Sequence, residues 1–135
     1  PALIFFPSAT AVKSRILTLF PPFMSVMFAV FHSFSCSEES ARILARRGVY
    51  MAFNGIVTFK NAEKTRRAAK TVPDELLLVE TDCPYLTPEP HRGKLNYPAY
   101  VRYTAEKAAA LRGEPFGTLA QNTTANAYRF YYKMR

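Results

Sequence analysis

The chain has 135 residues, of which 49% are hydrophobic and 21% are charged. This length and composition are typical of one globular domain rather than of a disordered chain. The net charge is +8, and all ten acidic residues lie between Glu38 and Glu114, so we expect an anionic partner such as nucleic acid, a phosphate-bearing molecule or a membrane surface. An ordinary solvated surface is the alternative. Cys36 and Cys83 form neither a disulfide framework nor a zinc-finger spacing, which favours a reducing compartment, the cytoplasm.

The first segment, residues 1–25, contains no motif and specifies little structure. Ile16–Phe31 is apolar and follows two basic residues, as in a signal segment, but a Pro-Pro step interrupts it. It is also shorter than the roughly 20 residues that span a bilayer, so we expect no membrane segment. Its second part, Val26–Phe31, predicts a buried strand, and we therefore expect the folded domain to cover residues 26–135.

From residue 26 onward the sequence predicts strands that alternate with helices. The predicted elements are the strand Val26–Phe31, a helix that begins at a capping box of Ser35 and Glu38 and stops at Gly48, the strand Tyr50–Phe53, the basic helix Lys60–Thr71 and the strand Leu76–Glu80. Strands and helices in this order imply right-handed crossovers and a parallel α/β sheet. The last strand is an almost unbroken apolar run, which is typical of a strand buried on both faces.

The rest of the chain predicts a loop followed by helices. Four prolines between Pro84 and Pro98 exclude regular structure there. Asn96 is expected to cap a helix that ends at Gly113. Thr118 with Gln121 predicts a short helix, and a last helix is expected from Thr123 or Thr124.

Polar side chains follow each predicted strand at the end where the strand stops. These are His32, Asn54 and Asp82, and parallel strands would gather them on one rim, the usual ligand site of such sheets. Imidazole and carboxylate suit zinc, manganese or magnesium, so His32 and Asp82 are candidate metal ligands. Two ligands do not make a site, and a structural histidine or a capping aspartate remains the alternative.

Further candidates lie beside this rim. His91, Arg92 and Lys94 form a basic cluster suited to phosphate oxygens, although an ordinary solvated loop tip fits equally well. Glu80 is expected to point away from Thr81 and to pair with a basic group. Nucleophilic catalysis by either cysteine has little support, because nothing pairs a thiolate with an imidazole.

Five ordered segments of the chain resemble the C-terminal half of the TatD family of metal-dependent deoxyribonucleases. The segments are Phe31–Ser35, Phe53–Ala62, Val79–Leu86, Pro90–Lys94 with Asn96 and Pro98, and Thr123–Asn126. The resemblance implies a (β/α)8 barrel, here its C-terminal half, that hydrolyses phosphodiester bonds of DNA with a divalent metal ion, Mg²⁺, Mn²⁺ or Zn²⁺. By this likeness His32 is a metal ligand, and Asp82 is a metal ligand that also helps to activate the attacking water. His91 and Arg92 would lie near the substrate phosphates.

The departures from the family pattern predict an incomplete enzyme. The family begins with a His-x-His strand, but the only histidines here are His32 and His91, and residues 1–25 match none of the motifs. We therefore expect a poor or inactive nuclease that self-associates through exposed sheet edges. The alternatives are a non-catalytic nucleic-acid-binding remnant, which would use the basic Lys60–Lys70 helix and the basic ends of the chain, and a related hydrolase with a non-DNA substrate.

Overall fold

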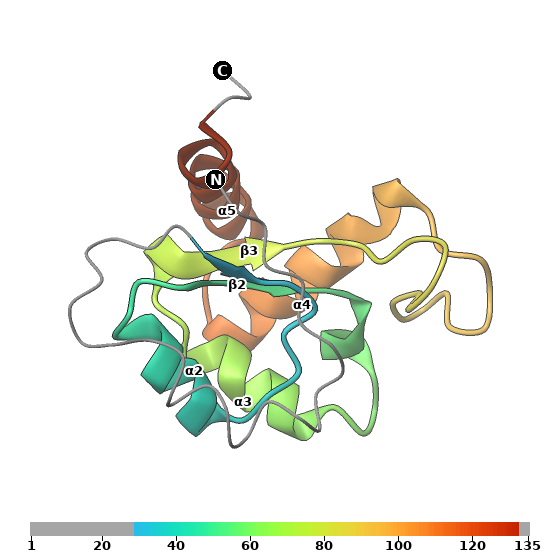
Figure 1. The fold of residues 1–135 in the computed structure, drawn as a ribbon. Helices are drawn as coiled ribbons and strands as arrows, with labels where there is room; N and C mark the ends of the chain where they lie inside the picture. The colour runs from blue at the N-terminus through green and yellow to red at the C-terminus, as the bar shows by residue number, and fades with distance from the viewer. Residues whose placement is uncertain (1–28, 133–135) are drawn as a thin grey trace.

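A computed structural model describes residues 29–132 as a parallel sheet flanked by helices (Figure 1). The strands are β1 (Val30–Phe31), β2 (Tyr50–Phe53) and β3 (Leu77–Val79), in the spatial order β1-β2-β3. Both neighbouring pairs run parallel, with Phe31 opposite Met51 and Phe53 opposite Val79. The predicted α/β class with a parallel sheet is therefore confirmed.

Two strands differ in length from their predictions. Residues 26–28 of the predicted first strand lie outside the described residues, and the described part is Val30–Phe31. The predicted strand Leu76–Glu80 shortens to β3 at both ends. Leu76 closes a 3-10 helix, because its backbone N–H donates to the carbonyl of Pro73 at 3.0 Å.

Two helices, α2 (Glu38–Ala45) and α3 (Glu63–Thr71), follow β1 and β2 and lie side by side below the sheet in the view of Figure 1. The predicted cap of α2 at Ser35 is wrong. Ser37 has extended backbone and its side chain accepts from the backbone N–H of Ser40 at 3.2 Å, so this later hydroxyl begins the helix. α3 also begins later than predicted, since residues 55–58 form a 3-10 helix and a turn follows it.

The C-terminal part of the described chain holds two long helices, α4 (Val101–Arg112) and α5 (Phe116–Phe130). Gly113 ends α4 in the left-handed region (φ 71°), as predicted. Asn96 does not cap this helix, because its amide donates to the carbonyl of Tyr85 at 2.6 Å and a 3-10 turn precedes α4. The two predicted last helices are one: the Thr123 hydroxyl donates to the Leu119 carbonyl inside α5, so it does not start a new helix.

An aromatic cluster lies under the end of the sheet that carries the polar side chains. Phe34 and Phe53 are fully buried, and their ring centroids are 5.5 Å apart. Phe31 packs edge-on against Phe34 at 5.2 Å. Burying each such ring contributes about 1.5–3 kcal/mol, so the backbone between Phe31 and Phe34 is anchored at both ends. This anchored turn contains His32 and Ser33.

Among residues 29–132, no helix is long and apolar enough to cross a membrane.

Candidate metal centre

The strand ends place polar side chains from separate parts of the chain on one rim of the sheet. His32 follows β1, Asn54 follows β2, and Glu80 and Asp82 follow β3. The backbone N–H of Glu80 donates to the Phe53 carbonyl at 2.9 Å, which keeps the segment after β3 beside the end of β2. The rim predicted from the strand order is therefore present.

Three of these side chains converge. The Nε2 atom of His32 lies 3.3 Å from Oε2 of Glu80 and 3.4 Å from Oδ1 of Asp82. One ligand atom from each residue lies within 4.8 Å of the other two. Two atoms that each lie about 2.1 Å from one tetrahedral ion are about 3.4 Å apart, so the His32 spacings fit a shared divalent cation.

The second oxygen of each carboxylate is held from another direction. Oε1 of Glu80 accepts the backbone N–H of Ser33 at 2.6 Å. Oδ2 of Asp82 accepts the side-chain amide of Asn54 at 2.6 Å. Each carboxylate therefore has one oxygen fixed by the protein and one directed at the imidazole, an arrangement that suits monodentate binding of a cation.

Exposure and charge differ within the group. The His32 side chain is 65% exposed, whereas those of Glu80 and Asp82 are 16% and 19% exposed. Burial raises the pKa of Glu80, the neighbouring Asp82 carboxylate raises it further, and the Ser33 N–H and His32 lower it in part. A cation at this position would favour ionised Glu80, and the exposed imidazole side leaves room for water or substrate.

Glu80 is the member of this group that sequence reasoning missed as a ligand. It was expected to pair with a basic group, and its contact with His32 agrees with that expectation. Alternation along an extended segment puts residues two positions apart on the same side, so Glu80 was expected on the side of Asp82, but the two carboxylates were not combined into one site. Two acids within three residues at a strand end were the available signal.

The loop cluster His91, Arg92 and Lys94 follows β3 but makes its own contacts. The His91 ring stacks on Tyr100 with centroids 4.4 Å apart, and its Nε2 atom lies 3.1 Å from the Tyr103 hydroxyl. The guanidinium of Arg92 lies 3.7 Å above the Phe59 ring. In the described part of the chain, these contacts tie His91 to the start of α4 and Arg92 to the segment after β2, not to the three converging side chains.

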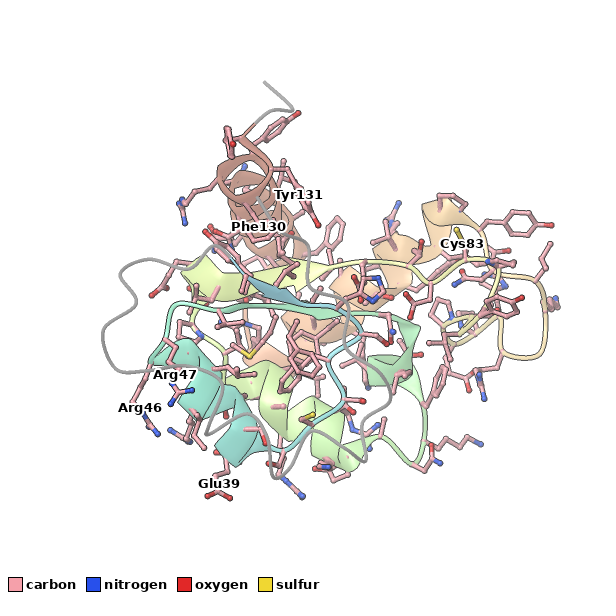
Figure 2. All side chains as sticks on the ribbon, viewed as in Figure 1. Glu39, Arg46, Arg47, Cys83, Phe130 and Tyr131 are labelled. Carbon is pink, nitrogen blue, oxygen red and sulfur yellow. The ribbon has the colours of Figure 1, made fainter. Side chains whose placement is uncertain are left out.

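The segment after β3 is exposed at Cys83, which Figure 2 shows at the right of the view. It is also fastened to the segment after β2. A Cβ atom on Gly55 would lie 2.1 Å from the Leu86 carbonyl oxygen, so only glycine permits this close approach. The loops that carry Asn54 and Asp82 are thus packed together.

A family model described as "TatD related DNase" matches residues 13–132 of the chain. The chain belongs to the TatD family. The match begins before Val30, so the likeness starts earlier than the sequence motifs indicated. The relatives include YabD of Bacillus subtilis (47% identical over 102 residues) and YcfH of Escherichia coli K12 (52% over 103), both named uncharacterized metal-dependent hydrolases.

Solved structures of TatD proteins share the fold. The TatD homolog YjjV of Escherichia coli superposes with a TM-score of 0.71 at 30% identity, and a TatD family hydrolase of Entamoeba histolytica with 0.65 at 19%. The predicted fold, part of a (β/α)8 barrel, is confirmed. The alignments cover 76% of this chain but only 40% and 39% of YabD and YcfH. The names of both relatives, metal-dependent hydrolases, agree with the predicted divalent-metal cofactor but do not specify the ion.

Proposed function

We propose that residues 26–135 are the C-terminal part of a metal-dependent hydrolase that cleaves phosphodiester bonds of DNA. The observation that carries this proposal is the convergence of one imidazole and two carboxylates within 4.8 Å at the ends of parallel strands. The description of the matching family as TatD related DNase and the net charge of +8 support DNA as substrate.

The side chains at the strand ends have two roles in this proposal, metal binding and proton transfer. His32 and Asp82, with Glu80, would hold the ion. A bound divalent cation supplies positive charge to the phosphate and lowers the pKa of water. Asp82 would accept a proton from the water whose oxygen attacks phosphorus and would then release that proton to solvent, while the bond to the leaving oxygen breaks and that oxygen takes a proton from solvent. The second Asp82 oxygen stays held by Asn54 during this transfer.

The exposed Arg92 and Lys94 supply phosphate contacts in this proposal. The guanidinium carbon of Arg92 lies 3.7 Å from the centroid of the Phe59 ring, and the exposed N–H groups of this side chain would donate to an oxyanion. His91 contributes by supporting this loop against Tyr100 and Tyr103 and contacts substrate at its remaining edge.

Metal binding and DNA cleavage are tested separately. Mn²⁺ titration of the purified chain should show one site, lost in Asp82→Ala and kept in Glu75→Ala, which removes an exposed carboxylate at the other end of β3. Absence of any Mn²⁺ binding by the unaltered chain would exclude the site.

Labelled DNA is then incubated with Mg²⁺, Mn²⁺ or Zn²⁺ and with EDTA. We expect slow, metal-dependent cleavage that Asp82→Ala abolishes, because few ligands are present. Metal binding with hydrolysis of another phosphate ester, but none of DNA, would contradict the DNA substrate. Salt-sensitive DNA binding that ignores metal would instead favour the nucleic-acid-binding remnant.

A further inference from the structure

We propose that Asn54 is a positioning residue for the metal centre: its side-chain amide holds one oxygen of Asp82 so that the other faces His32. The inference rests on the metal site of the proposed function and adds a residue that does not itself touch the ion.

Asn54 is a buried polar residue whose hydrogen-bonding capacity is largely used. Asn54 directly follows β2, and only 3% of its surface is exposed. Its Nδ2 atom donates to Oδ2 of Asp82 at 2.6 Å and to Oγ of Ser33 at 2.6 Å, and its Oδ1 atom accepts the Ile56 N–H at 3.0 Å. Because a backbone N–H must meet the amide oxygen, this third bond fixes which end of the amide faces Asp82.

The same network reaches the second carboxylate. Ser33 accepts from Asn54 through its hydroxyl and donates through its backbone N–H to Oε1 of Glu80 at 2.6 Å. Ser33 adopts the left-handed region (φ 52°), which a serine rarely adopts, and in this conformation its N–H meets Glu80. One chain of hydrogen bonds therefore runs from Asp82 through Asn54 and Ser33 to Glu80.

These hydrogen bonds hold, in each carboxylate, the oxygen that faces away from His32, and they thereby orient both groups. The free oxygens, Oδ1 of Asp82 and Oε2 of Glu80, are the two that lie 3.4 and 3.3 Å from the imidazole. Without the amide, the Asp82 carboxyl group can rotate and the spacing that suits a cation is lost. Loss of an outer-shell partner of this kind weakens metal affinity by about ten- to a hundred-fold.

The test compares Asn54→Ala with Asn126→Ala. Asn126 is a matched control: it is 2% exposed, and its amide donates two hydrogen bonds, to the carbonyls of Asp74 and Leu77 at the opposite end of β3. Mn²⁺ affinity is measured by titration, the Co²⁺ absorption spectrum reports the coordination geometry, and melting without metal reports the fold.

We expect Asn54→Ala to raise the Kd for Mn²⁺ by about ten-fold or more and to alter the Co²⁺ spectrum. Asn126→Ala should lower the melting temperature yet keep both metal readouts. Ser33→Ala removes the hydroxyl that accepts from Asn54 but keeps the N–H that bonds to Glu80, and it should raise the Kd for Mn²⁺ several-fold. If Asn54→Ala does not fold, this variant tests the positioning role in its place.

Unchanged Mn²⁺ affinity in the folded Asn54 or Ser33 variant, or equal losses in the Asn54 and Asn126 variants, would overturn the positioning role while the metal site stands. If the unaltered chain binds no Mn²⁺, the proposed function and this inference both fail.

Discussion

Replacing Arg112 with alanine should strongly destabilise the fold. This arginine ends α4, and its side chain is only 10% exposed. Its guanidinium donates to the carbonyls of Ala69 and Val72 at 2.7 and 2.8 Å, where α3 ends. It also pairs with Glu114 at 2.8 Å and with Asp74. One cation thus satisfies two terminal helix carbonyls and joins α3 to α4.

The size of the loss follows from these contacts. A hydrogen bond from a charged donor to a buried acceptor contributes about 1.5–3 kcal/mol, and Arg112 makes two such bonds to main-chain carbonyls. Asp74 is 60% exposed, so its ion pair adds at most about 1 kcal/mol. Because water reaches part of the vacated space, we expect Arg112→Ala to lower the free energy of unfolding by about 3–5 kcal/mol.

Urea unfolding followed by circular dichroism measures this difference. Arg102→Ala is the matched control on the same helix, since Arg102 is 69% exposed, pairs with Glu106 and lies 5.7 Å from the centroid of the Phe116 ring. The control should unfold like the unaltered chain. Arg112→Lys should recover part of the lost unfolding free energy, because lysine keeps the positive charge but lacks the forked N–H groups of the guanidinium. A loss below about 1 kcal/mol for Arg112→Ala would refute the argument.

Three further predictions concern the loops and the metal. Gly55→Ala places a Cβ atom 2.1 Å from the Leu86 carbonyl oxygen, so thermal melting should show a loss of about 1–3 kcal/mol or more; an unchanged melting temperature would contradict the close approach. Gly113→Ala forces a side chain into the left-handed region and should cost about 1 kcal/mol in urea unfolding, whereas no loss would mean that α4 ends differently. Mn²⁺ at about a hundred times its Kd should stabilise the chain by about 2.7 kcal/mol and should not stabilise Asp82→Ala; equal stabilisation of both would place the ion elsewhere.

Local sequence reasoning was strongest where a residue's role depends on its immediate neighbours. The apolar run Tyr50–Phe53 forms the predicted strand without any change of boundary. Gly113 ends its helix as predicted, because the left-handed conformation is a local property of glycine. The predicted cap at Ser35 failed because Ser37 offers the same hydroxyl two residues later, and only the path of the backbone selects between them.

Sequence alone determined the order of strands and helices, and this order brings His32 and Asp82 to one rim because parallel strands end on the same side of a sheet. Tertiary structure decided the rest. Which oxygen of Asp82 is free, the convergence of Glu80 on His32, and the joining of two helices by Arg112 each depend on contacts between residues about 28 to 48 positions apart. Such contacts leave no periodic signal in the chain, since they are set by how the loops at the strand ends, and the ends of the helices, pack against each other.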